Sequence, residues 1–80
     1  MERLTKLIAE ILRISEKEIT DDLSINNTDT WDSLKHMELI VVIEETFKIK
    51  LTTEEIVIMV NMKAIKQILK NKGVNIKNGD

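Results

Sequence analysis

Apolar residues in the first thirteen positions recur with the spacing of one face of an α-helix. They follow the pattern i, i+3, i+4, i+7, i+8 of an amphipathic helix and are Leu4, Leu7, Ile8, Ile11 and Leu12. Such a helix must bury its apolar face against other elements. A chain of 80 residues has room for one small domain. We therefore predict a helix over residues 2–13 that packs on a small core.

The composition excludes several other architectures. The chain has no proline, two glycines and only Trp31 and Phe47 as aromatic residues, which disfavours an all-β barrel. Without cysteine and with a single histidine, it has no basis for disulfide frameworks, zinc knuckles or thiol chemistry. Its longest apolar runs, 39–43 and 56–60, are far shorter than the roughly 20 residues of a membrane span. The N-terminus does not resemble a signal peptide, so we expect a cytoplasmic protein. We also expect it to be a monomer.

A long loop is expected to follow the first helix. Residues 15–30 are rich in turn-forming polar side chains, and only Ile19, Leu23 and Ile25 are available to hold them against a core. Loops of this length are uncommon in compact domains and are usually functional or mobile. The segment is therefore predicted to be a tethered loop with something of functional value at its end.

Three more helices are expected after the loop. The second begins at Asp32 or Ser33 and reaches about Phe47. A threonine at position 52 or 53 offers the next cap, with Glu54 and Glu55 in the first turn, and residues 56–60 form a short third helix. The fourth starts at residue 61 or 62 and ends before Gly73, and its inward stripe is Ala64, Ile65, Ile68 and Leu69.

The runs 39–43 and 56–60 are rich in β-branched residues, and their periodicity alone fits buried strands as well as helices. The flanking caps and the spacing of the glutamates favour helices. The predicted fold is all-α: a small antiparallel four-helix bundle with a short third helix and a long first loop. Residues 1–73 form the domain, and residues 74–80 are expected to be a flexible tail.

Ser33 is the first candidate functional residue because it stands at the expected N-terminus of the second helix, directly after Asp32. A phosphate attached there would meet free backbone N–H groups and the positive end of the helix dipole. Plain helix capping explains the same two residues. His36 lies three residues further on and raises a nucleophile and base pair as an alternative, although the chain has no glycine-rich oxyanion loop.

The second helix has two faces of different character when plotted at about 100° per residue. The face expected to be buried carries His36, Leu39, Ile40, Ile43 and Phe47. The opposite face mixes apolar and acidic side chains, with Met37 at one edge, and carries Leu34, Glu38, Val41 and Glu45. An apolar centre with an acidic rim is typical of a transient docking site for basic partners, while scattered exposed apolar residues are also ordinary.

Two other kinds of site fail on pattern. The oxygen-rich stretch 21–32 places Leu23, Ile25 and Asn26 where a calcium loop needs ligands and a glycine. Lys63, Lys66 and Lys70 share a face of the fourth helix, but the net charge is −2 and stacking aromatic residues are lacking there. A solvated helix face explains the lysines better than nucleic-acid binding.

A set of residues spread over most of the chain resembles the acyl carrier protein family. It consists of Trp31-Asp32-Ser33-Leu34, Glu38-Leu39-Ile40, Ile43-Glu44-Glu45, Phe47 and Thr53-Glu54-Glu55-Ile56, in the register of that family. The resemblance also covers the first helix, the long loop and the short third helix. Many relatives have a glycine close before the motif, where this chain has Thr30 and Trp31.

The resemblance implies a carrier without turnover of its own. A phosphopantetheinyl transferase would attach 4′-phosphopantetheine covalently to Ser33, and Asp32 would help that enzyme to position metal and coenzyme A. Enzymes with basic docking patches that load and process acyl groups would bind Leu34, Met37, Glu38, Val41, Glu44 and Glu45. A pliable cleft for the acyl chain would be bordered by Val57, Met59 and Met62.

Charge is divided along the chain. Residues 29–55 hold seven acidic residues against three lysines, a net charge of −4, while residues 56–80 hold five lysines against Asp80, a net charge of +4. This division resembles a stand-alone carrier of a dedicated pathway more than a strongly acidic housekeeping one. The alternatives are an aminoacyl or peptidyl carrier, a helical interaction module in which Ser33 only caps, and the hydrolase based on His36.

Overall fold

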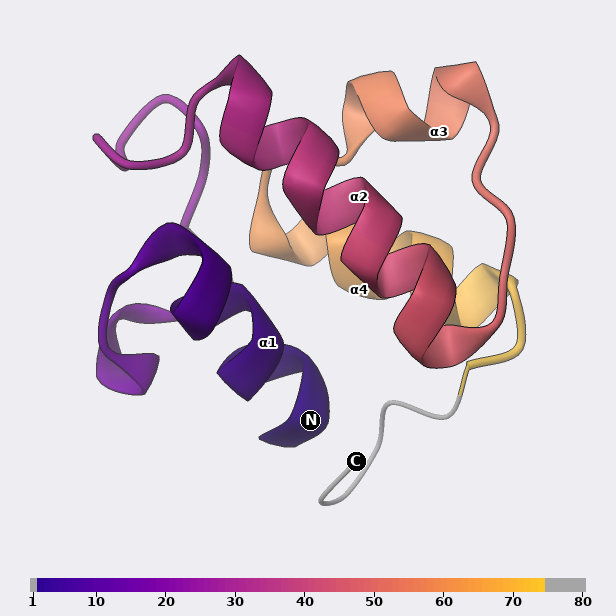
Figure 1. The fold of residues 1–80 in the computed structure, drawn as a ribbon, viewed down its shortest axis with the longest axis horizontal. Coiled ribbons are helices and arrows are strands. Elements are labelled where there is room, and N and C mark those ends of the chain that lie inside the picture. Colours follow the sequence, from indigo (N-terminus) through magenta and orange to yellow (C-terminus); the bar gives the residue numbers. More distant parts are fainter. Residues whose placement is uncertain (1, 75–80) are drawn as a thin grey trace.

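The computed structural model describes residues 2–74, which form four α-helices and one 3₁₀ helix. The elements are α1 (Glu2–Leu12), η1 (Glu16–Glu18), α2 (Ser33–Phe47), α3 (Thr53–Ile58) and α4 (Met62–Asn71). Figure 1 shows α2 lying between α1 and α3, with α4 behind it. The predicted all-α architecture with a short third helix is confirmed. Over this range, no helix combines the length and the apolar composition that crossing a bilayer requires.

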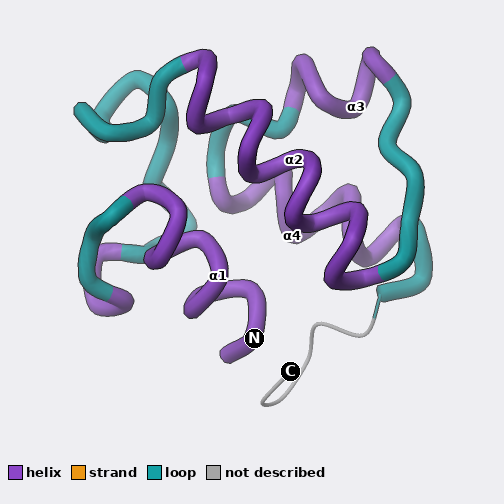
Figure 2. Tube along the Cα trace, in the orientation of Figure 1, coloured by secondary structure: helices purple, strands orange, loops and turns teal. Residues whose placement is uncertain are grey.

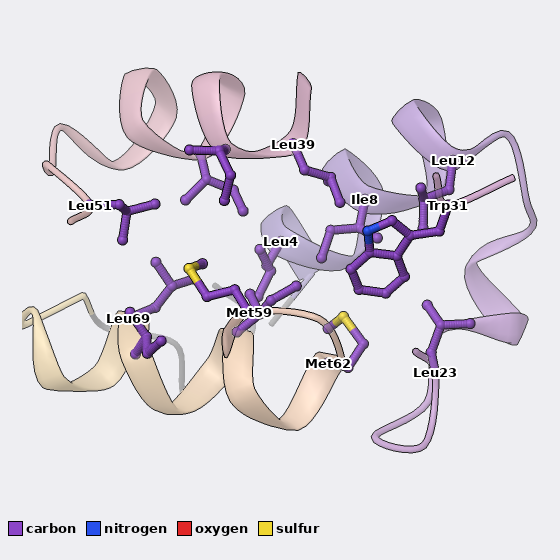
Figure 3. Close-up of a cluster of buried hydrophobic side chains, with 14 residues drawn as sticks. Leu4, Ile8, Leu12, Leu23, Trp31, Leu39, Leu51, Met59, Met62 and Leu69 are labelled. Carbon is purple, nitrogen blue, oxygen red and sulfur yellow. The ribbon is translucent and has the colours of Figure 1, made fainter. Parts of the chain in front are cut away.

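The core is a single apolar cluster enclosed by α1, α2 and α4. Figure 3 shows α2 and α4 on opposite sides of it, with the ring of Trp31 at one end. The helices contribute Leu4, Ile8 and Leu12 from α1, Leu39, Ile40 and Ile43 from α2, and Met62, Ile65, Ile68 and Leu69 from α4. The apolar stripes predicted for these helices therefore point inward as expected, with Ala64 and Phe47 only partly buried.

Polar side chains fix where the helices begin. Asp32 caps α2, Thr52 caps α3 and Asn61 caps α4, each by accepting a backbone N–H from within the first turn. The threonine cap predicted for the third helix is confirmed at Thr52, and reciprocal bonds between Thr52 and Glu55 start the helix at Thr53. The helix ends at Ile58 instead of residue 60, and Met59 lies beyond its end, fully buried.

Three helices end with a residue in the left-handed conformation. In each case the N–H of the following residue bonds to a carbonyl five residues back, in the last turn of the helix. The left-handed residues are Arg13 (φ 60°), Lys48 (φ 57°) and Gly73 (φ 86°). Val74, which was assigned to the tail, completes the cap of α4 and packs against the core. Residues 75–80 of the expected tail lie outside the described residues.

The long loop between α1 and α2 is tethered as predicted, with Leu23 buried and Ile19 and Ile25 packed against the core. Two backbone hydrogen bonds of 2.9 Å, from Ile25 to Val60 and from Met62 to Leu23, join it to the connection between α3 and α4. The loop also contains η1 (Figure 2), which the prediction missed although Ser15 and Glu18 have the spacing of a capping box.

Candidate functional site

Ser33 is exposed and is the first residue of α2. The Oδ1 atom of Asp32 accepts the N–H of Lys35 at 2.9 Å, and the Asp32 carbonyl accepts the N–H of His36 at 2.8 Å. The amides of Ser33 and Leu34 belong to the first turn and have no carbonyl partner within the helix. The serine hydroxyl is therefore accessible at the electropositive end of a helix that its neighbouring aspartate caps.

A buried histidine fixes the structure around this end of α2. The indole N–H of Trp31 donates to Nδ1 of His36 at 3.1 Å, and Nε2 of His36 lies 2.8 Å from the carbonyl oxygen of Ile56. Because the indole can only donate, Nδ1 accepts, and a neutral imidazole then carries its proton on Nε2. His36 thus ties the end of the loop and α2 to α3, which holds Ser33 at a defined place.

This arrangement contradicts the nucleophile and base alternative for Ser33 and His36. Both ring nitrogens of His36 are already hydrogen-bonded, to Trp31 and to Ile56. The imidazole is 9% exposed and is on the buried side of α2, whereas Ser33 is exposed. The imidazole has no free nitrogen with which to accept the proton of the serine hydroxyl, so the pair cannot act as a hydrolase site.

The predicted division of α2 into a buried and an exposed face is confirmed. His36, Leu39, Ile40 and Ile43 are buried, while the opposite side keeps large apolar groups in solvent, with exposed fractions of 72% for Leu34, 49% for Met37 and 50% for Val41. Glu38 and Glu45 are exposed beside them. We refer to Leu34, Met37, Glu38, Val41 and Glu45 as the outward face of α2.

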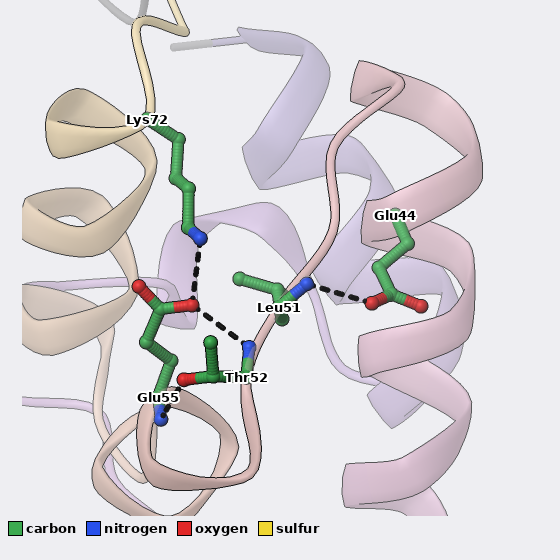
Figure 4. Close-up of polar contacts among 5 residues, drawn as sticks. All are labelled: Glu44, Leu51, Thr52, Glu55 and Lys72. Carbon is green, nitrogen blue, oxygen red and sulfur yellow. Dashed lines mark hydrogen bonds and ion pairs between the residues drawn. The ribbon is translucent and has the colours of Figure 1, made fainter.

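Glu44 was expected with these residues but has another position. Its Oε2 atom accepts the N–H of Leu51 at 2.8 Å (Figure 4), which ties the end of α2 to the segment before α3. The side chain is half-buried rather than fully exposed. Within this structure, Glu44 stabilises the connection between two helices.

A groove that the sequence did not predict lies between the C-terminal end of α1 and the outward face of α2. Its volume is about 520 Å³. The α1 wall is formed by Glu10, Ile11 and Arg13, and the α2 wall by Leu34, Lys35, Met37, Glu38, Val41 and Val42. The sequence gives no signal for it, because Ile11 lies near the centre of the apolar stripe of α1 on a helical wheel and yet is only partly buried.

The residues proposed for an acyl cleft do not share an open surface here. Met59 and Met62 are 0% exposed and belong to the core, while Val57 on α3 is 65% exposed. The two methionines fill the space between α2 and α4 (Figure 3). In this conformation they have the packing role of core residues.

Two carboxylates near α4 have lowered pKa values because each binds a lysine. The hydrogen bond from Lys72, at 2.8 Å, and the backbone N–H of Thr52 hold the pKa of Glu55 below its ordinary value (Figure 4). The hydrogen bond and charge of Lys66, at 2.6 Å, do the same for the pKa of Asp21. Both pairs attach α4 to neighbouring segments and lie away from Ser33 in the sequence.

Ser33 fits a covalently attached phosphate ester. The hydroxyl is exposed, and the first-turn amides of α2 can stabilise negative charge beside it. The aspartate cap is engaged with the amide of Lys35 and so leaves the amides of Ser33 and Leu34 available. In the described residues there is no cluster of three or more side chains able to hold a metal ion.

Comparison with known proteins identifies the family. Residues 2–61 match the family model described as "Phosphopantetheine attachment site". An acyl carrier protein of Buchnera aphidicola subsp. Baizongia pistaciae is 34% identical over 68 residues, covering 85% of this chain and 87% of that protein. One from Buchnera aphidicola subsp. Acyrthosiphon pisum (strain Tuc7) is 41% identical over 54 residues, 68% of each chain.

A solved structure supports the same assignment. The solution NMR structure of a holo acyl carrier protein from Geobacter metallireducens superimposes with a TM-score of 0.78 and is 31% identical, covering 89% of this chain and 82% of that chain. The sequence match and the fold match therefore agree with the resemblance drawn from the residues around Ser33. The chain belongs to the acyl carrier protein family, as a non-catalytic carrier whose cofactor is phosphopantetheine.

Proposed function

We propose that Ser33 is the residue to which 4′-phosphopantetheine is attached, and that the chain presents acyl groups to enzymes of fatty acid, polyketide or related biosynthesis. The observation that carries this proposal is the exposed Ser33 hydroxyl at the N-terminus of α2, next to a capping aspartate. The bound group supplies a thiol that holds the acyl chain as a thioester, in a chain that has no cysteine of its own.

The attachment is a phosphoryl transfer carried out by a phosphopantetheinyl transferase. Ser33 Oγ forms a phosphodiester bond to the pantetheine-bearing phosphate of coenzyme A. The pyrophosphate bond of coenzyme A breaks, adenosine 3′,5′-bisphosphate leaves, and the hydroxyl proton passes to the transferase. The first-turn amides and the dipole of α2 then stabilise the charge of the attached phosphate.

Other residues have supporting roles in this proposal. Asp32 caps α2 and assists the transferase in positioning metal and coenzyme A. The outward face of α2 receives the basic patches of partner enzymes, because its exposed apolar side chains provide contact area and Glu38 and Glu45 attract positive charge. Glu44 contributes charge to the same surface while its carboxylate holds Leu51.

The acyl chain is proposed to occupy a cleft that is closed in the present conformation. Val57, Met59 and Met62 are proposed to border a cleft that forms when α3 moves away from α2, since the two methionines are buried in the present conformation. The hydrogen bond between His36 and the Ile56 carbonyl is the polar link that such a movement would break. Methionine suits this task because its unbranched side chain adapts to irregular partners.

The pathway and setting are part of the proposal. The charge of −4 over residues 29–55 and of +4 over 56–80 favours a stand-alone carrier of a dedicated pathway, working as a monomer in the cytoplasm. An aminoacyl or peptidyl carrier would use the same arm and differ in the adenylating enzyme that loads it.

Intact-mass measurement tests the assignment of Ser33. The chain is incubated with coenzyme A and a broad-specificity phosphopantetheinyl transferase, beside Ser33→Ala. We expect the native chain to gain the mass of one phosphopantetheine group and Ser33→Ala to gain none, with unchanged helicity by circular dichroism. Modification of both chains, or of neither, would contradict the proposal, and the second outcome would favour the helical interaction module.

A further inference from the structure

The groove between α1 and α2 lies within reach of any enzyme that acts on Ser33. Leu34, which directly follows Ser33, is in its α2 wall, and Val42 is about 14 Å from Ser33 along the helix axis at 1.5 Å per residue. A protein–protein interface of ordinary size buries about 800 Å² on each partner, which corresponds to a circle of about 16 Å radius. An interface centred on Ser33 therefore reaches along the α2 wall of the groove.

The groove is suited to receive an apolar side chain. Its walls present Ile11 from α1 and Met37, Val41 and Val42 from α2. Met37 and Val41 are each about half exposed. Burial of either side chain by a partner would therefore release water from apolar surface. Aromatic and aliphatic anchors that fill such a recess supply most of the binding energy in interfaces of this size.

Each wall of the groove carries one basic and one acidic side chain. On α2, Lys35 Nζ and Glu38 Oε1 are 3.1 Å apart and neutralise each other in part. On α1, Arg13 is exposed, and no ion pair found within residues 2–74 includes it. Glu10 is the other charged residue of that wall. A partner that covers the groove thus meets Glu10 and Arg13 on the α1 side, and Arg13 is the basic group there that an acidic side chain of the partner can reach.

We propose that the phosphopantetheinyl transferase inserts an apolar side chain into the groove between α1 and α2, and that an acidic side chain of the same enzyme pairs with Arg13. This inference rests on the proposed attachment at Ser33. It extends the docking surface from α2 onto α1 and assigns the transferase an interface of mixed charge, with basic groups toward Glu38 and Glu45 and an acidic group toward Arg13.

Transfer kinetics test the pairing of Arg13. Holo formation is followed by intact mass at several concentrations of the apo chain, for the native protein, Arg13→Glu, Arg13→Lys and Lys17→Glu. The Lys17→Glu control makes the same charge change on exposed η1, outside the groove. We expect Arg13→Glu to raise KM about tenfold at unchanged kcat, a coupling of about 1.4 kcal/mol. Arg13→Lys and Lys17→Glu should stay within about twofold of the native KM.

An equal KM for Arg13→Glu and Lys17→Glu would overturn the pairing. Melting curves of the two variants exclude a folding defect as the cause of a difference. If the native chain is modified at Ser33 while Arg13→Glu behaves like the control, only this inference fails. If the native chain takes up no phosphopantetheine, the proposed function itself fails.

Methyl NMR tests the apolar anchor without a destabilising mutation. The Ser33→Ala chain, which cannot be modified, is labelled at isoleucine and valine methyl groups and titrated with the transferase. The inference predicts that the signals of Ile11 and Val42, in the groove, shift or broaden, and that those of Ile49 and Val74, which line a different hollow, stay in place. Binding that leaves Ile11 and Val42 unperturbed would overturn the anchor.

Discussion

The helices α2 and α4 share a construction but differ in what they leave in solvent. Each begins at a capping Asp or Asn side chain, and each buries four residues. The outer side of α4 is polar, with Lys63, Gln67 and Lys70 exposed. The outer side of α2 keeps Leu34, Met37 and Val41 at least 49% exposed. Folding accounts for every apolar residue of α4, whereas α2 has apolar side chains that folding does not use, so these are available for contact with another molecule.

The largest expected effect is the difference in stability between the same leucine-to-alanine substitution in the two helices. Leu69 on α4 is 0% exposed and Leu34 on α2 is 72% exposed. We expect Leu69→Ala to reduce the free energy of unfolding by about 2–5 kcal/mol, because it removes buried methyl groups and leaves a cavity. Leu34→Ala should stay within about 0.5 kcal/mol and instead slow phosphopantetheine transfer. Urea unfolding and transfer kinetics of both variants measure the two effects. Similar losses of stability would show that Leu34 serves the fold.

The next largest effect concerns the buried side of α2, which carries the histidine, while the inward residues of α4 are apolar. His36→Leu removes the partner of the Trp31 indole N–H and of the Ile56 carbonyl. The buried indole N–H is left unpaired, which costs about 1–3 kcal/mol, whereas the Ile56 carbonyl keeps the N–H of Met59 at 3.4 Å. We therefore expect a loss of about 1–3 kcal/mol in the free energy of unfolding. Because Trp31 is the one tryptophan of the chain, urea unfolding followed by its fluorescence reports on this contact directly.

A substitution in α4 provides the matched control for His36→Leu. Ile65→Leu keeps an apolar side chain of the same volume at a buried position and should lose less than about 1.5 kcal/mol. Protection of the α3 amides from hydrogen exchange should fall in His36→Leu and persist in Ile65→Leu. If His36→Leu were as stable as the native chain, the hydrogen-bonded link between α2 and α3 would have no role in holding Ser33.

Local patterns explain which parts of the fold could be predicted from the sequence. The buried side of α2 follows from a spacing of three and four residues, and the caps at Asp32 and Asn61 follow from side chains adjacent to the first turn. The exposed position of Ser33 follows from its place directly after the capping residue Asp32. The start of α3 follows from the cap at Thr52, but its predicted end was two residues too late because the β-branched run carries no boundary signal.

The two site features that the sequence did not reveal depend on contacts between distant segments. His36 binds the carbonyl of Ile56, twenty residues away, and a backbone carbonyl has no residue type that a pattern could recognise. The groove is lined by residues of two helices, among them Ile11 and Val42, which are far apart in the sequence. Helical periodicity assigns a residue to a face but does not determine how closely the neighbouring helix covers that face.

A smaller effect concerns the C-terminal ends of α2 and α4. Both end in a left-handed residue, but α2 uses Lys48 (φ 57°) and α4 uses Gly73 (φ 86°). Gly73→Ala meets no atom within 4 Å, so its expected loss of about 1 kcal/mol comes from the backbone conformation alone. Lys48→Gly should be stabilising or neutral, by up to about 1 kcal/mol, because relief of the conformation is offset by greater freedom of the unfolded chain. Thermal unfolding of both variants measures the two shifts, and a loss in Lys48→Gly would show that its side chain stabilises the end of α2.

The smallest effect is expected from the partly exposed ion pair between Lys72, at the end of α4, and Glu55 in α3. The pKa of Glu55 is lowered by Lys72, so the folded chain binds a proton at this carboxylate less readily than the unfolded chain, whose value is near 4.5. Its stabilisation is therefore complete at neutral pH and is lost as the pH falls below 4.5 and through the lowered pKa. Within residues 2–74, the ion pair of α2 is internal to that helix, whereas those of α4, at Lys66 and Lys72, join it to other segments. Acidification should thus reduce hydrogen-exchange protection in α3 and α4 before α2.

Glu55→Gln should be less stable than the native chain at pH 7 and equal to it at low pH, with a difference that shrinks as salt screens the pair. A difference that persisted at low pH would show that Glu55 does not act through Lys72, because the charge of the carboxylate is lost in the native chain once Glu55 is protonated.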